Sequence, residues 1–108
     1  MSKFDVFVGG VLDGTRSLAK DLVDDLQQQS RADAQAFLDK TQADLQRWTG
    51  LLANGQLSEM DFSDLVHAKK ALAEIHALTQ AGIAATKLER FRSGLVDLVI
   101  DTAFKVFL

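Results

Sequence analysis

Histidines and cysteines are the first residues to consider for metal binding or acid–base chemistry. The chain has two histidines, His67 and His76, and no cysteine. On one helix these two rings would project from opposite sides, because each residue turns the helix by about 100°. They would not share a metal ion. Asp64 lies one turn before His67, a spacing more typical of a surface ion pair than of a metal site, and His76 falls on an apolar track as a hydrogen-bonded interface histidine.

Carboxylate pairs and a glycine-rich segment are the other candidates for chemistry. No nucleophile or histidine accompanies Asp24 with Asp25, or Asp97 with Asp101, so both pairs are interpreted as solvated faces. The glycine-rich segment at 9–14 lacks the Lys-Ser/Thr of a phosphate loop. Gly10 and Gly14 are four residues apart and indicate a close contact with another helix. We therefore expect no catalytic residue, cofactor or metal site, and no enzyme.

One local cluster of basic residues is interpreted as a solvated helix face. It consists of Lys87, Arg90 and Arg92, interleaved with Phe91 and interrupted by Glu89. The net charge of −3 is spread evenly along the chain, and no basic arm is present. Nucleic acid is therefore not an expected partner.

The composition favours an all-α fold. The 108 residues include no proline and seven glycines, and the 47% hydrophobic content with 25% charged residues is typical of a folded domain. The length fits one domain, residues 1–108. Neither a signal peptide nor a transmembrane segment is recognisable, which favours a cytoplasmic protein, although export without a leader would leave no mark.

Asn54-Gly55 is the strongest turn signal, and it divides the chain into two arms. Ser58, with Asp61 three residues later, predicts the start of the next helix. Apolar residues recur about every 3.7 residues in both arms, 4–53 and 58–108. We predict a long antiparallel helical hairpin with its turn at 54–57, about 75 Å long, packed into a multi-helix oligomer.

A monomeric up-down-up-down four-helix bundle is the alternative, with loops in the polar stretches near 27–35 and 76–82. In that bundle Ser30 with Asp33 would cap the second helix, and Gly82 would end the third. The chain from Thr15 to Thr49 contains no Gly, Pro or Asn, residues that tight interhelical turns usually use, and this favours the hairpin.

Both ends of the chain are more apolar than one helix face requires. We expect these ends to form a homo-oligomer interface, so that the protein is a structural or interaction protein whose partner is itself or another helical protein. The expected interface residues are Phe4, Phe7, Val8, Val11, Leu12, Leu95, Leu98, Val99, Ile100, Phe104, Val106, Phe107 and Leu108.

Two other functions fit the same pattern. Phe-rich terminal helices can bind a membrane surface, although Asp97 and Asp101 on the polar stripe fit this less well than Lys or Arg would. Trp48-Thr49-Gly50 resembles the motif of the small secreted WXG proteins, a resemblance that implies a dimerising helical hairpin. The tyrosine-containing export motif of that family is absent, because the chain has no tyrosine.

Overall fold

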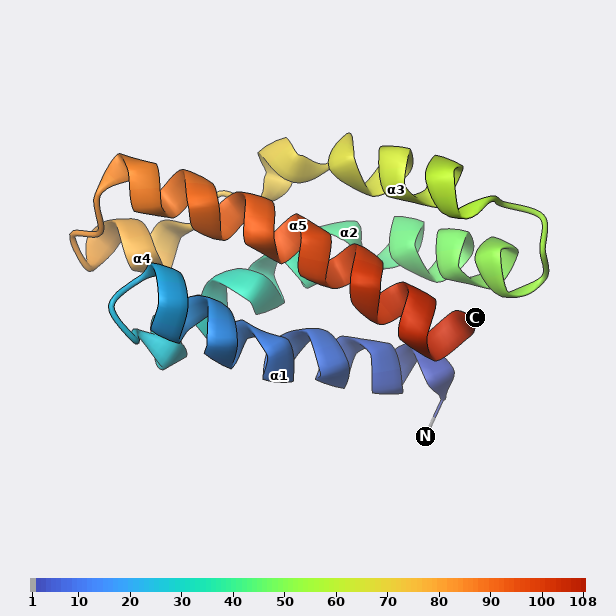
Figure 1. Ribbon diagram of the computed structural model, residues 1–108, viewed down its shortest axis with the longest axis horizontal. Helices are drawn as coiled ribbons and strands as arrows, with labels where there is room; N and C mark the ends of the chain where they lie inside the picture. The colour runs from blue at the N-terminus through green and yellow to red at the C-terminus, as the bar shows by residue number, and fades with distance from the viewer. Residues whose placement is uncertain (1) are drawn as a thin grey trace.

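The computed structural model describes residues 2–108 as helices joined by short loops (Figure 1). The elements are α1 (Lys3–Leu22), α2 (Gln27–Ala53), α3 (Glu59–His67), the single 3₁₀ turn η1 (Lys70–Leu72), α4 (His76–Gln80) and α5 (Ala85–Phe107). The all-α class is confirmed. The molecule measures 42 × 27 × 21 Å.

The long helices form an up-and-down bundle, in which α1 packs mainly on α2 and α5. α3 lies beside α5, while α4 lies against α2. α3, η1 and α4 together occupy the place of one interrupted helix. Both chain ends and the α2–α3 turn lie at the same end of the bundle (Figure 1). We call this end the terminal end.

The chain reverses where the sequence predicts it. α2 ends at Ala53, and Gly55 has a positive φ of 73° that glycine adopts without strain. Ser58 then caps α3 by accepting a hydrogen bond from the N–H of Asp61 at 3.0 Å. The two arms, however, are not continuous helices. Each one bends back on itself, as the four-helix alternative predicts. The molecule is therefore 42 Å long instead of the about 75 Å of a straight hairpin.

The first arm reverses at 23–26 without a glycine. Asp24 and Asp25 both adopt the left-handed conformation, with φ of 57° and 62°. Aspartate is one of the few residues other than glycine that enter this region readily. The N–H of Asp25 donates to the carbonyl of Ala19 at 2.8 Å and closes the turn. The absence of Gly, Pro and Asn therefore does not prevent a tight turn here. The loop lies just before the polar stretch 27–35, in which the four-helix alternative places it.

The second arm is interrupted between α3 and α5, where Ile75 (φ 56°) and Gly82 (φ 85°) have left-handed backbones. The second arm still packs on the first arm in the antiparallel order of a hairpin. The backbone N–H groups of Ala77 and Leu78 both donate to the carboxylate of Asp33, at 2.8 and 2.9 Å. The segment around His76 therefore lies beside 31–35, as a hairpin turning at 54–57 would place it.

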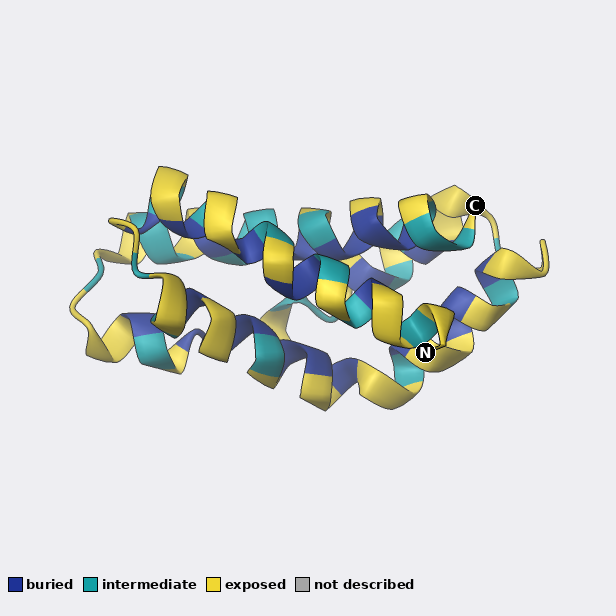
Figure 2. Cartoon of the chain, turned by 90° about the horizontal axis from the view of Figure 1, so that it is seen from below, coloured by how far each residue is buried: buried dark blue, intermediate teal, exposed yellow. Residues whose placement is uncertain are grey.

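The core fills the space between the helices, and exposed residues cover the outward faces (Figure 2). Burying aromatic and branched side chains is the main stabilising contribution to such a fold. The largest fully buried side chains are Phe7, Phe37, Phe62, Phe91, Leu45, Leu78, Leu95, Val11, Val23, Val66, Val96 and Val99.

Candidate functional site

Three glycines bring α1 and α5 close together. A Cβ atom at Gly10 would lie 2.9 Å from Cγ2 of Thr102, and one at Gly14 would lie 2.6 Å from Cδ1 of Leu98. Gly94 makes the reciprocal contact, since its Cβ would lie 2.9 Å from Cδ2 of Leu18. The close helix contact expected at Gly10 and Gly14 therefore lies within one chain. Gly94 is the member that the sequence analysis did not single out.

The residues expected to form an oligomer interface divide into three groups by burial. The six buried ones face the core of their own chain, so in this fold they offer no surface to a second copy: Phe7, Val11, Leu12, Leu95, Val99 and Ile100. Six more are half-buried against that core: Phe4, Val8, Leu98, Phe104, Val106 and Phe107. Only Leu108 is exposed. One chain thus covers most of the apolar surface that the sequence analysis assigned to a partner.

Aromatic contacts hold the two ends of the chain together. The ring centroid of Phe7 lies 5.6 Å from that of Phe4 and 5.9 Å from that of Phe107. The rings of Phe62 and Phe104 are likewise 5.9 Å apart and join α3 to α5. These separations are typical of favourable aromatic pairs. The terminal turns of α1 and α5 are therefore ordered within the monomer.

Some apolar surface nevertheless remains at the terminal end. Val6 is 49% exposed and Leu108 is 62% exposed. The ring centroids of Phe7 and Phe107 are 5.9 Å apart, so the helix ends that carry Val6 and Leu108 adjoin. We define the terminal apolar patch as Phe4, Val6, Val106, Phe107 and Leu108. The other two exposed large apolar side chains among residues 2–108, Met60 and Leu72, lie on α3 and η1.

Two grooves border α1. The first has a volume of about 240 Å³ and is lined by apolar, amide and acidic side chains, namely Ser2, Phe4, Asp5, Val8, Gln35, Leu38, Asp39, Gln42 and Gln46. The second, of about 190 Å³, is lined by Leu12, Thr15, Arg16, Gln27, Gln28 and Arg31. Neither lining contains a histidine or a cysteine, so neither groove offers the usual nucleophile–base pair. The first groove shares Phe4 with the terminal apolar patch.

Both histidines lie on the surface. The side chain of His76 is 73% exposed, and its Nε2 lies 2.6 Å from Oε2 of Glu74, so it is not the interface residue that its place on the apolar track indicates. Nδ1 of His67 lies 2.8 Å from the carbonyl oxygen of Ser63, and its Nε2 lies 3.6 Å from Asp97 on α5 rather than near Asp64. Within residues 2–108, no three His, Asp or Glu side chains gather as a metal site.

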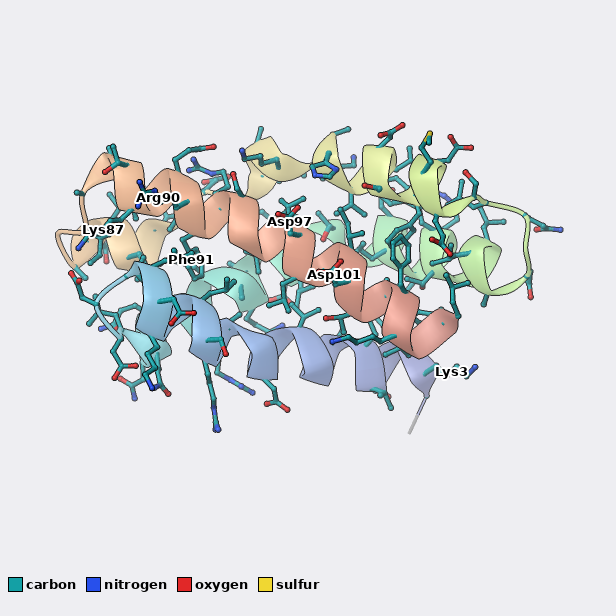
Figure 3. All side chains as sticks on the ribbon, viewed as in Figure 1. Lys3, Lys87, Arg90, Phe91, Asp97 and Asp101 are labelled. Carbon is teal, nitrogen blue, oxygen red and sulfur yellow. The ribbon has the colours of Figure 1, made fainter. Side chains whose placement is uncertain are left out.

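Two of the three basic residues in the α5 cluster form separate ion pairs. Lys87 binds Asp24 at 3.0 Å, and Arg92 binds Glu89 at 2.6 Å while its Nε donates to the carbonyl of Ala73 at 2.7 Å. Lys87 and Arg90 lie along the first turns of α5, and Asp97 and Asp101 follow further along the helix (Figure 3). Lys87 and Arg92 thus each pair with an acidic residue of their own chain.

Lysine neighbours lower the pKa of three carboxyl groups. Hydrogen bonding from Lys40 is the main cause at Glu74, and hydrogen bonding from Lys70 is the main cause at Glu89. Lys69 has the same effect on the pKa of Asp44. A lowered carboxyl pKa favours the charged form and is the opposite of what a general acid requires.

The four-helix alternative predicts that Ser30 with Asp33 caps the second helix, and this is wrong. α2 begins at Leu26 with no side-chain cap, and Asp33, only 6% exposed, binds the backbone of α4 instead. Ser30 is fully buried, and its hydroxyl has no hydrogen-bond partner. The only available signal was their place in a polar stretch of α2, which does not indicate a partner about 45 residues away.

Trp48 to Gly50 lie inside the last turns of α2 rather than at the reversal of the chain. Trp48 is 7% exposed and lies under the cations of Arg47 and Lys69, each 5.9 Å from its ring centroid. Such contacts stabilise packing. The WXG-like residues are therefore part of the bundle.

None of the helices described is both long enough and apolar enough to cross a membrane. Comparison with models of protein families, with curated proteins and with solved structures finds no match to this chain.

Proposed function

We propose that this protein is a helical interaction module that associates with a second copy of itself through the terminal apolar patch. The observation that carries the proposal is the exposure of Val6 and Leu108 on adjoining helix ends, next to half-buried Phe4, Val106 and Phe107. A surface on which several apolar residues adjoin is more typical of a binding site than scattered single residues are.

A second copy suits this surface because the surrounding charges have both signs. Lys3 and Asp5 lie in the first turn of α1, while Asp101 and Lys105 lie on the last turns of α5. In a two-fold contact the same patch meets itself, so a lysine of one copy can face an aspartate of the other. The patch is small, and interfaces below about 1,200 Å² are typically weak and transient. We therefore expect a reversible dimer.

The test is sedimentation or light scattering over a concentration series. The wild-type mass should rise above 11.8 kDa as concentration increases, and Val6→Asp with Leu108→Asp should abolish the rise. Phe104 and Phe107 are poor choices for substitution because their rings pack on Phe62 and Phe7.

Met60→Asp is the matched control. Met60 is 75% exposed and lies in the first turn of α3, outside the residues that define the patch, where an aspartate is tolerated. It should leave the association unchanged. A wild-type protein that stays monomeric at every concentration contradicts the proposal, as does an equal effect of Met60→Asp. Flotation of the protein with anionic vesicles would instead support the membrane-surface alternative.

A further inference from the structure

We propose that the turn at 23–26 is a hinge through which this protein exchanges α1 with a second copy of itself. In the exchanged form α1 and α2 join into one helix. The α1 of each chain then occupies the place of α1 in the other chain. This dimer is distinct from association through the terminal apolar patch and does not depend on it.

The helix ends at this turn have the sequence of a helix interior. α1 ends at the C-cap Val23, and α2 begins at the N-cap Leu26, which makes no side-chain capping bond. The first turn of α2 contains no acidic residue. In contrast, Ser2 and Ser58 cap α1 and α3 with their side chains. The hinge therefore lacks the residues that normally end and begin helices.

The apolar spacing also continues across the hinge. Leu18, Leu22 and Leu26 are four residues apart and are followed at the same interval by Ser30 and Ala34. On a continuous helix each step of four would turn the side chain by about 40°, so neighbours in this series would adjoin and the series would wind slowly around the helix. A straight helix from residue 3 to residue 53 would be about 75 Å long. The sequence is thus compatible with both the bent and the straight arm.

The bent form places two consecutive residues in a conformation that L-amino acids disfavour. Asp24 and Asp25 have φ of 57° and 62°, and straightening would return both to the right-handed helix. Opposing this, the carbonyl of Ala19 accepts the N–H of Asp25 at 2.8 Å, and Lys87 binds Asp24 at 3.0 Å. The balance between these contributions sets the population of the two forms.

The exchange would preserve the packing of α1. Its contacts are mainly with α2 and α5, and the glycine contacts between α1 and α5 would reform between chains without change. Exchange of an identical element is a low-cost route to a dimer, because the closed monomer and the dimer share the same interfaces. The occupant of the vacated position is therefore another α1.

The test compares hinge variants by light scattering. Asp24→Ala with Asp25→Ala favours a continuous helix and should raise the dimer fraction about tenfold or more over Asp24→Gly with Asp25→Gly, which tolerates the left-handed turn. Asp13→Ala with Asp64→Ala removes the same charge from exposed positions elsewhere and should have no effect. All variants carry Val6→Asp and Leu108→Asp, so that association through the terminal apolar patch does not contribute to the dimer fraction.

A disulfide identifies exchange directly, since the chain has no cysteine. Gly10→Cys with Thr102→Cys places a thiol on each side of the α1–α5 contact. On a non-reducing gel, the alanine hinge variant should run as a covalent dimer and the glycine variant as a monomer. If the alanine variant fails to fold, refolding the two-cysteine protein at high concentration should still yield covalent dimers. An alanine hinge variant that stays monomeric, or dimers with disulfides only within each chain, would overturn the proposal. So would refolding at high concentration that yields only monomers.

Discussion

Asp33 joins α2 to α4, and replacing it offers the sharpest test of how the irregular second arm is held. Its carboxylate accepts the N–H groups of Ala77 and Leu78 at 2.8 and 2.9 Å. These donors belong to the first turn of α4, which has no side-chain cap of its own because its N-cap is Ile75. Asp33→Ala removes both hydrogen bonds and leaves the donors unsatisfied.

The expected loss is large relative to the stability of a small domain. A hydrogen bond to a charged group contributes about 1.5–3 kcal/mol, so two give about 3–6 kcal/mol. Ala77 is half-buried and its N–H can be partly hydrated, which favours the lower limit of about 3 kcal/mol. Asp33→Asn keeps one oxygen acceptor and should lose about half as much. The domain as a whole is stable by about 5–15 kcal/mol.

Urea unfolding monitored by circular dichroism measures the effect. With a slope of about 1–1.5 kcal/mol per molar, Asp33→Ala should lower the midpoint by about 2–3 M. Hydrogen exchange should show that Ala77 and Leu78 lose protection before the amides of α5 do. Asp39→Ala, an exposed substitution on the same helix, should change stability by less than about 0.5 kcal/mol. An Asp33→Ala protein within about 1 kcal/mol of the wild type would refute the reasoning.

Three further predictions concern glycine packing, a buried hydroxyl and an ion pair. Gly9→Ala should stabilise the protein by about 1 kcal/mol and raise its melting temperature, because a Cβ there meets open space, whereas Gly10→Ala should destabilise it by about 1 kcal/mol because its Cβ would lie 2.9 Å from Thr102 of α5. Equal shifts in melting temperature would contradict the close α1–α5 contact at Gly10. Ser30→Ala should raise the free energy of unfolding in urea by about 1 kcal/mol, because it removes a buried hydroxyl without a hydrogen-bond partner. A lower free energy of unfolding would mean that the hydroxyl does have a hydrogen-bond partner. Lys40 lowers the pKa of Glu74 in the folded protein, so this pair stabilises above the ordinary range of a glutamate and loses its effect as pH falls below about 4. Wild type and Lys40→Met should therefore differ in urea midpoint at pH 7, and the difference should shrink as the pH falls below the ordinary range of a glutamate; a difference that does not shrink would contradict this.

The local features of the sequence were predictable where one residue and its immediate neighbours decide them. Asn54-Gly55 ends α2 and Ser58 begins α3, because positive φ and capping are properties of a short segment. The turn at Asp24 and Asp25 was not predicted. Aspartate enters the left-handed region more readily than most residues, but it also fits a helix, so the segment by itself does not distinguish a turn from a continuous helix.

The expected oligomer interface shows the same limit. Apolar periodicity indicates that Phe7, Val11 and Leu95 are covered, but it does not indicate whether their own chain or a second one covers them. In this fold the first arm bends back, and the residues are buried within one chain. Of the expected interface residues only Leu108 is exposed; Val6, which was not among them, is the other exposed member of the terminal apolar patch.

By itself the sequence determined that the chain is helical, that it reverses near residue 55, and that its halves pair in antiparallel order. These follow from composition, turn residues and periodicity, which act over a few residues. Only the tertiary structure decided that each arm folds in half and that Asp33 caps α4. Those outcomes depend on contacts between residues far apart in the chain, where the free energy of burying a surface is the same whichever helix covers it.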